Sequence, residues 1–170
     1  MPVVYTIGYE GTDISRFVTT LNAVGVETLV DVRAVALSRK KGFSKTALRQ
    51  HLEASGIRYE HLIGLGDPKD GREAARAGRY KIFERIYTNH LKSERAQEAL
   101  STLEGIVQDS VTCLMCFERD PKTCHRSIVV ECLTNNHLVS FDLYGDDPDR
   151  YVRNRHLLQS RHSRQSSSTT

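Results

Sequence analysis

The feature that most constrains the fold of this chain is an alternation of short apolar runs with stretches of helical periodicity. The run Val3 to Ile7 is rich in β-branched residues and ends at Gly8, and apolar residues at helical spacing follow it as far as Leu21. A second apolar run, Val26 to Val32, comes next. A strand, a helix and a strand in this order form a βαβ unit, whose two strands lie parallel in one sheet.

The same alternation continues along the rest of the chain. Strand-like patterns recur at Ile57 to His61, Val111 to Phe117 and Leu138 to Leu143, and helical spacing fills most of the intervals between them. The exception is Gly64 to Gly78, which is rich in Gly, Asp, Lys and Arg and is expected to be a mobile surface loop. We therefore expect one three-layer α/β domain, with a mainly parallel sheet of about five strands and helices on both faces.

The length of 170 residues and the hydrophobic content of 39% are enough for one core. We expect the α/β domain to span residues 1–145 and a basic, flexible tail to span 146–170. The tail carries five arginines against three aspartates, and its last part, Gln159 to Thr170, is mostly Ser, Arg and Thr. Deletion of residues 151–170 is therefore expected to leave the fold intact.

Composition narrows the cellular setting and the class of partner. No apolar stretch approaches the roughly 20 residues that a membrane-spanning helix needs, and no basic segment followed by an apolar one opens the chain. We therefore expect a cytoplasmic protein with reduced cysteines. The formal net charge is +3, most of it in the tail, so the body is nearly neutral. This disfavours broad, phosphate-driven binding of nucleic acid, although local cation clusters can still bind anions.

The densest group of reactive side chains lies between Cys113 and Arg126. Side chains alternate along a strand, so Cys116 and Glu118 share a face that Cys113 does not. This argues against a C-x-x-C metal site, because the two sulfurs would point to opposite sides of the sheet. Cys113 and Cys132 are expected to be ordinary core residues.

Cys124 has a different setting, because it is expected in the first turn of a helix beside His125 and Arg126. The helix field and an adjacent cation lower a thiol pKa, which predicts a partly ionised Cys124; the alternative is a cysteine that only packs the helix against the sheet. His125 can be a general acid or base, a metal ligand or a donor that holds the loop. Glu118 either pairs with an arginine or acts on a ligand.

Further candidates lie at the expected carboxyl edge of the sheet, where open α/β sheets bind ligands. Asp31 and Arg33 share a strand face there and either bind a ligand or form an ion pair with each other. Arg39 belongs to a basic loop next to this edge. The turn after Gly8 matches neither the dinucleotide fingerprint nor a P-loop, so no nicotinamide or ATP site is predicted and no cofactor is identified.

Several motifs, taken together, resemble those of the bacterial family called domain of unknown function 488. They are Thr6-Ile7-Gly8-Tyr9, Asp31-Val32-Arg33, Ser38-Arg39 and Cys116-x-Glu118-x-x-Pro121-x-x-Cys124-His125-Arg126. The resemblance covers residues 3 to 144 and implies a compact α/β domain. Its recurring polar residues correspond to Arg33, Ser38, Arg39, Cys116, Glu118, Cys124, His125 and Arg126. Tyr9 stands where many relatives have serine or histidine, and the arginine-rich tail is not part of the family pattern.

Three functions remain open at this point. The first is an enzyme for an anionic substrate, phosphorylated or nucleotide-like. Under this hypothesis Arg33, Arg39 and Arg126 hold the anion, with Asp31, Ser38 and Tyr9 beside them, and the chemistry comes from Cys124, His125, Glu118 or Cys116. The second is a module in which the same arginines and Tyr9 or Phe43 clamp a nucleotide or nucleic acid without turnover. The third is a metal site of Cys116, Cys124 and His125. Under the first two, Asp31, Arg33, Glu118 and Arg126 are expected to converge in one cleft.

Overall fold

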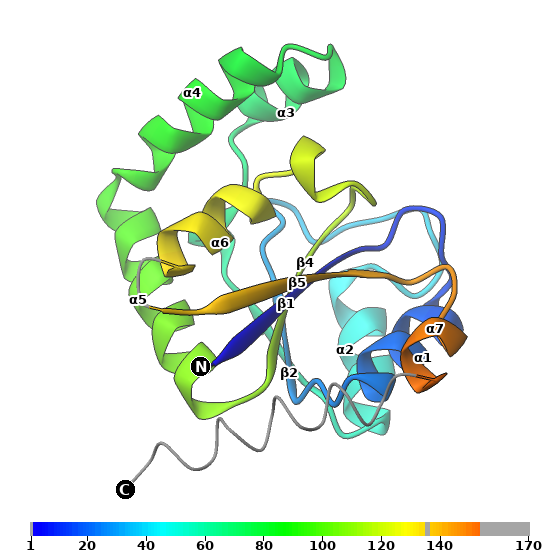
Figure 1. Ribbon diagram of the computed structural model, residues 1–170. Helices are drawn as coiled ribbons and strands as arrows, with labels where there is room; N and C mark the ends of the chain where they lie inside the picture. Colours follow the sequence, from blue (N-terminus) through cyan, green and yellow to red (C-terminus); the bar gives the residue numbers. More distant parts are fainter. Residues whose placement is uncertain (1, 135–136, 154–170) are drawn as a thin grey trace, which may run out of the picture.

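The computed structural model describes residues 2–134 and 137–153, and its strands form one parallel sheet (Figure 1). The five strands lie in the spatial order β3-β2-β4-β1-β5. Their bounds are β1 Val3–Gly8, β2 Thr28–Asp31, β3 Arg58–His61, β4 Thr112–Cys116 and β5 Val139–Tyr144. The predicted α/β fold with a parallel sheet of about five strands is confirmed, and the described pairs are all parallel.

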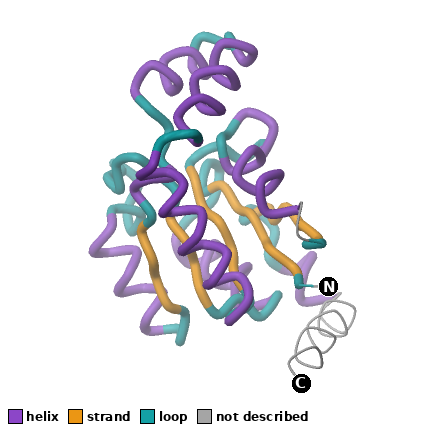
Figure 2. Tube along the Cα trace, turned by 90° about the vertical axis from the view of Figure 1, so that its left-hand side faces the viewer, coloured by secondary structure: helices purple, strands orange, loops and turns teal. Residues whose placement is uncertain are grey.

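Helices cover both faces of the sheet (Figure 2). The described helices are α1 Ile14–Ala23, α2 Lys45–Ala54, α3 Lys69–Arg76, α4 Tyr80–Leu91, α5 Glu94–Asp109, α6 Arg126–Thr134 and α7 Asp149–Arg153, with short 3-10 turns η1 Ile63–Leu65 and η2 Pro121–Thr123. The helices α1, α2 and α7 contribute to one hydrophobic cluster, and α3 to α6 contribute to the other. No helix in the described part of the chain is long and apolar enough to cross a membrane.

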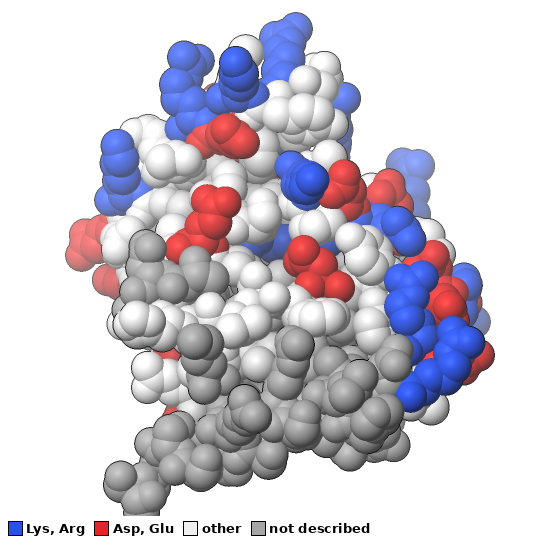
Figure 3. Space-filling model, viewed as in Figure 1, with Lys and Arg blue, Asp and Glu red and all other residues white. Residues whose placement is uncertain are grey.

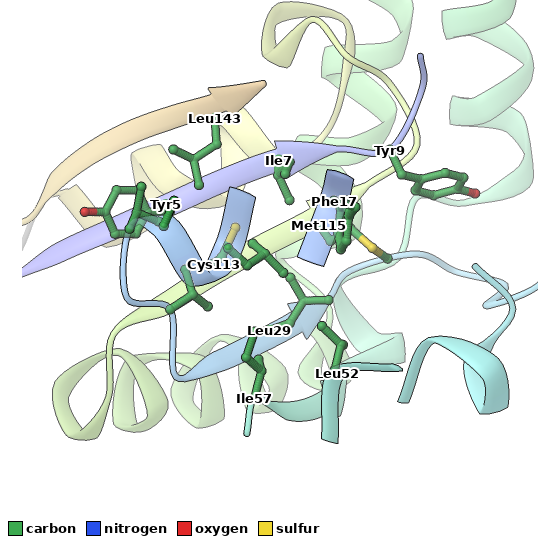
Figure 4. Packing of buried hydrophobic residues seen from close by; sticks show 14 of the residues in the cluster. Tyr5, Ile7, Tyr9, Phe17, Leu29, Leu52, Ile57, Cys113, Met115 and Leu143 are labelled. Carbon is green, nitrogen blue, oxygen red and sulfur yellow. The ribbon is translucent and has the colours of Figure 1, made fainter. Parts of the chain in front are cut away.

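The alternation of side chains along the strands separates the two clusters. On β1, Tyr5 and Ile7 belong to the cluster under α1 and α2, whereas Val4 belongs to the cluster under α5 and α6. On β4, Cys113 points to the first cluster, where it lies among other core residues (Figure 4), and Cys116 points to the second. A parallel strand buried on both faces explains why these segments read as continuous apolar runs.

The strand order creates a crevice at the carboxyl end of β4. The chain leaves β1 toward α1 on one face, whereas it leaves the neighbouring strand β4 toward α6 on the opposite face. The last residues of these two strands, Gly8 and Cys116, are register partners. Adjacent strands whose connections diverge in this way leave an opening at which open α/β sheets bind ligands.

The prediction that residues 64–78 form a loop is wrong. The turn η1 and the helix α3 occupy most of this segment, and Gly71 and Ala74 are buried. The charged residues of the helix are exposed, apart from Arg72, which is half-buried. With only alanine and glycine on its inner face, it lacks the large apolar side chains that reveal a helix by periodicity.

Packed structure also continues past the expected domain boundary at residue 145. Tyr151 on α7 is only 5% exposed and packs in the cluster under α1. Its hydroxyl accepts a hydrogen bond of 2.7 Å from the backbone N–H of Tyr144. One aromatic residue therefore anchors a segment that composition predicted to be tail. The stretch Gln159 to Thr170, which we expected to be disordered, lies outside the described residues.

Candidate functional site

A pocket of about 830 Å³ opens at the carboxyl ends of the strands. Its walls come from the segments that follow β1, β2 and β4 and from α3 with the start of α4. It brings together eight of the predicted site residues: Tyr9, Arg33, Ser38, Arg39, Cys116, Glu118, Cys124 and His125. The two others, Asp31 and Arg126, are fully buried behind this lining and contact it. Of the four residues predicted to converge in one cleft, Arg33 and Glu118 line it, whereas Asp31 and Arg126 lie behind its wall.

Cys116 and Cys124 are joined as a disulfide at this pocket. The expectation of four reduced cysteines is therefore wrong for this pair, while Cys113 and Cys132 are free. The strand β4 ends at Cys116, and the following loop turns back through η2 so that Cys124 returns to the strand end. Strand periodicity carries no information about such a return, which is why the pairing was missed.

Cys124 lies ahead of α6 and not in its first turn as predicted. Asp120 accepts a hydrogen bond of 2.9 Å from the N–H of Lys122 and caps the 3-10 turn η2, after which Cys124 is extended. The helix α6 begins at Arg126, whose backbone N–H points at Cys124 Sγ at 3.5 Å. The sulfur therefore still faces the N-terminal end of a helix, where a negative charge is favoured.

Arg126 supports the site from beneath and does not reach into the pocket. Its Nη1 lies 2.7 Å from Cys116 Sγ, and it also donates to the carbonyl oxygens of Glu118 and, at 3.0 Å, Arg119. Its Nε lies 3.2 Å from Thr6 Oγ1, which in turn donates to Asp142. Among the described residues no carboxylate forms a salt bridge with Arg126, and burial lowers its pKa. The charge of Asp142, which Thr6 links to Arg126, opposes this fall most strongly.

Gly8 allows the loop after β4 to take this path. A Cβ atom at Gly8 would overlap the carbonyl oxygen of Glu118 and crowd the backbone N of Arg119. The loop therefore crosses the end of β1 at a distance that only glycine permits. This close approach places the Glu118 carbonyl where Arg126 binds it.

His125 is held as a neutral ring. Its Nε2 lies 2.6 Å from the carbonyl oxygen of Val32, and because a carbonyl can only accept, Nε2 carries the hydrogen. The unprotonated Nδ1 then faces Cys124 Sγ at 3.7 Å. Burial lowers the pKa of His125 to about 4, so the ring is uncharged at neutral pH. After reduction of the disulfide, Nδ1 would be a proton acceptor for the Cys124 thiol.

Asp31 and Arg33 were expected either to bind a ligand or to form an ion pair with each other. In the structure they form a buried ion pair. Arg33 Nη2 lies 2.8 Å from Asp31 Oδ2, and Nη1 donates to the carbonyl oxygen of Phe43 at 2.7 Å. Tyr59 donates to the same carboxylate at 2.6 Å. Burial alone lowers the pKa of Arg33, but its hydrogen bonds and charge interaction with Asp31 outweigh this and raise it. The guanidinium thereby fixes the loop that forms one pocket wall.

Tyr9 and Ser38 are similarly engaged within the wall. The Tyr9 ring stacks on Phe43, with centroids 4.6 Å apart, and meets the edge of Phe117. Ser38 Oγ accepts the N–H of Lys40 at 3.1 Å. These contacts stabilise the shape of the pocket, so an aromatic clamp at Tyr9 would need the stacked ring to move.

Sequence analysis predicted some of the cations that line the open pocket and missed the two on α3. Arg39 was predicted, and the others that line the pocket beside Arg33 are Lys40, Arg72 and Arg76. Lys40 and Arg72 donate to the backbone carbonyls of Tyr9 and Asp67, whereas Arg39 and Arg76 are exposed. The two arginines of α3 were missed because this helix was interpreted as a loop, although their spacing of four residues is a helical signal.

Two carboxyl groups in the pocket have raised pKa values. Asp67 is 5% exposed, and its Oδ1 has no hydrogen-bond partner. Burial raises the pKa of Asp67 to about 7, with Arg72 opposing the rise and Glu118 adding to it. Burial likewise raises the pKa of Glu118. A carboxyl group with the pKa of Asp67 exchanges protons near neutral pH, and carboxyl groups with raised pKa values are common at working sites.

The geometry also identifies which residues could hold a metal ion. Ligand atoms of Cys116, Glu118 and Cys124 lie within 4.8 Å of one another. The metal site predicted from the sequence consisted of Cys116, Cys124 and His125. In the structure one nitrogen of His125 is bound to the carbonyl oxygen of Val32, and Glu118 takes the third position. Two thiolates and a carboxylate are a donor set suited to Zn²⁺ once the disulfide is reduced.

The fold and the site together define the chain as a parallel α/β protein with paired cysteines in a cation-lined pocket at its sheet edge. The chain belongs to the family described as Domain of unknown function DUF488, whose model matches residues 13–133. The predicted resemblance is thereby confirmed. Neither the curated proteins nor the solved structures contain a significant match.

Proposed function

We propose that this protein is an enzyme that acts on an anionic substrate through the thiol groups of Cys116 and Cys124. The observation that carries this proposal is the position of both sulfurs in a pocket that also contains exposed arginines. A reactive thiol and an anion-binding wall in one concave site are the two parts that such an enzyme needs.

The setting of Arg126 favours a thiolate at Cys116 in the reduced protein. Reduction by an external dithiol gives two thiols and an oxidised dithiol, and Cys116 then loses one proton to solvent. The guanidinium 2.7 Å from this sulfur stabilises the negative charge, because a buried cation needs a counter-charge. Cys124, which faces the Arg126 N–H and the His125 ring, is placed to assist the Cys116 thiolate.

Arg39 and Arg76 supply the anion-binding part of the proposal. Both line the pocket and are exposed, so their guanidinium groups can reach a ligand that enters from solvent. Arginine binds phosphate and carboxylate groups through two parallel hydrogen bonds. A substrate with a phosphate or carboxylate group would thereby be oriented with its other end toward the sulfurs.

A second candidate function is a metal centre, which the mutual approach of Cys116, Glu118 and Cys124 favours. Reduced protein would then bind Zn²⁺, and Cys116→Ser or Cys124→Ser would abolish this binding while Cys113→Ser would not. Tight zinc binding that requires Cys116 and Cys124 but not Cys113 would favour a metal centre over thiol chemistry as the function of this pocket.

Protection of the cysteines from alkylation tests the proposed enzyme site. Reduced protein is treated with iodoacetamide, and mass spectrometry follows Cys116, Cys124 and Cys132 with and without inorganic phosphate or adenosine monophosphate. We expect either anion to slow the two pocket cysteines several-fold and to leave Cys132 on α6 unchanged. Arg76→Ala should weaken the protection, whereas Lys45→Ala on α2 should not. Equal rates with and without anions would contradict an anion-binding site beside the thiols.

A further inference from the structure

Positive charge gathers in two parts of the chain. One is residues 33–52, which carry six cations and no carboxylate. The other is formed by α3, α4 and their connection, residues 69–92, which we call the helical arm. The arm carries seven cations against three carboxylates, so its net charge is +4. Its cations are Lys69, Arg72, Arg76, Arg79, Lys81, Arg85 and Lys92.

The arm projects beyond the carboxyl end of the sheet. Figures 1 and 2 show α3 and α4 side by side, outside the layers formed by the other helices. Lys and Arg side chains surround them in the space-filling view (Figure 3). The apolar residues Ala74, Phe83 and Tyr87 of the arm are buried in the core cluster. Tyr80 and Ile82 at the start of α4 are exposed, and they lie among the charged residues of the outer surface.

The base of the arm is also a wall of the pocket. Arg72, Arg76 and Tyr80 line the pocket that contains Cys116 and Cys124. The side chain of Tyr80 is 44% exposed, and it lies where the arm meets the opening. A ligand that binds along the arm would therefore continue into the proposed active site.

We infer that the helical arm binds single-stranded nucleic acid and leads one nucleotide of it into the pocket. This inference rests on the proposed function and names its substrate class. A small anion needs only the cations inside the pocket, whereas cations spread over two helices outside it suit a ligand with repeated phosphates. A single strand is favoured because its unpaired bases can stack on an exposed aromatic ring such as Tyr80 and enter a pocket.

The arm is better suited to bind a nucleic acid than a membrane. An interfacial helix binds lipid through an exposed apolar face that lies opposite its cations. The corresponding face of α4, with Phe83, Tyr87 and Leu91, is buried against the protein. Four of the seven cations are arginines, whose planar donors match phosphate oxygens.

Fluorescence anisotropy with a labelled oligothymidylate of about twelve nucleotides tests the inference. The arm variant Arg79→Ala/Lys81→Ala/Arg85→Ala removes three cations outside the pocket. The matched control, Lys45→Ala/Arg49→Ala/Arg58→Ala, removes three exposed cations from α2 and β3. We expect the arm variant to bind at least about tenfold more weakly and to lose about two units from the slope of log affinity against log salt. The affinity of the control variant should stay within about twofold of that of the unmodified protein, because the inference places the bound strand on the arm and not on the cationic segment that contains Lys45 and Arg49.

The variant Cys116→Ser/Cys124→Ser separates this inference from the proposed thiol chemistry. It should bind the oligonucleotide like the unmodified protein, because the arm does not depend on the sulfurs. Absence of binding by the unmodified protein, equal losses in the arm and control variants, or equally strong competition by polyglutamate would each overturn the inference. Circular dichroism of every variant establishes that the helices are retained.

Discussion

Arg126 is the residue on which the proposed site depends most. It is fully buried, and its donors join the Cys116 sulfur to the carbonyl oxygens of Glu118 and Arg119. Sequence analysis assigned it to the binding of an anionic ligand. The structure instead gives it two tasks, since it holds the loop after β4 and places a cation beside a cysteine. A buried arginine of this kind acts on a ligand only through the groups that it positions.

Glu118 is expected to disfavour the thiolate forms of the two pocket cysteines, whereas Arg126 favours the thiolate of Cys116. Its carboxyl group lies within 4.8 Å of both sulfurs, and a carboxylate at this distance raises a thiol pKa. Glu118→Gln should therefore accelerate the alkylation of Cys116 and Cys124 in reduced protein by several-fold at pH 7. Rates from mass spectrometry check this, with Glu53→Gln on α2 as the distant control. A slower or unchanged rate would remove Glu118 from the electrostatics of the site.

Asp67 is expected to make stability depend on pH. Its pKa of about 7 in the folded protein lies above the ordinary value of 3.8, so the folded state binds the proton more tightly. This contribution to stability is fully present below about pH 4 and is lost as the pH rises through 7. Asp67→Asn cannot lose this contribution, because asparagine does not titrate. Between pH 4 and 8 the free energy of unfolding of the variant should therefore rise by up to about 4 kcal/mol relative to that of the unmodified protein.

Urea unfolding at both ends of this pH range measures the effect of Asp67→Asn. The matched control is Asp70→Asn, an exposed aspartate in the first turn of α3, which begins two residues after Asp67. A stability difference that is the same at pH 4 and pH 8 would mean that Asp67 titrates normally and takes no part in proton exchange at the pocket.

At the scale of elements, periodicity predicted the strands and most helices because their inner faces carry large apolar residues. Phe17 and Leu21 on α1 and the alternating residues of β1 are examples. The helix α3 was missed because its buried residues are Gly71 and Ala74, and the return of Cys124 to Cys116 was missed because it depends on a loop. Several site residues could be predicted because strand ends meet at one edge of a parallel sheet. Their roles in binding or catalysis remain predictions.

The helix α7 is expected to contribute to stability, contrary to the prediction from composition. Tyr151 is buried, and its hydroxyl accepts the N–H of Tyr144 at the end of β5. Tyr151→Ala should destabilise the protein by about 3 kcal/mol, and Tyr151→Phe by about 1 kcal/mol. Thermal unfolding checks both values, with Val152→Ala as an exposed neighbour. A melting temperature unaffected by Tyr151→Ala would restore the prediction that residues from 151 onward are dispensable.

At the scale of the whole molecule, the strand order determines where chemistry can occur. β4 lies between β2 and β1, and both of these strands lead to helices on the face opposite to α6. The crevice at the end of β4 is therefore a consequence of topology. It receives Cys116 from the strand, Cys124 from the returning loop and cations from the helical arm. The same topology keeps Cys113 on the other face, where burial raises its pKa.

The pH dependence of alkylation of the four cysteines in reduced protein tests most directly whether the paired thiols are the working groups of this site. We predict that Cys116 reacts fastest and ionises below the ordinary thiol value of about 8.5, with Cys124 next, because only these two face cationic or N–H donors in the pocket. Cys132 and Cys113, whose pKa values burial raises, should react slowly. Equal slow labelling of all four cysteines, or ionisation of Cys116 no earlier than that of Cys132, would contradict a thiol-dependent function.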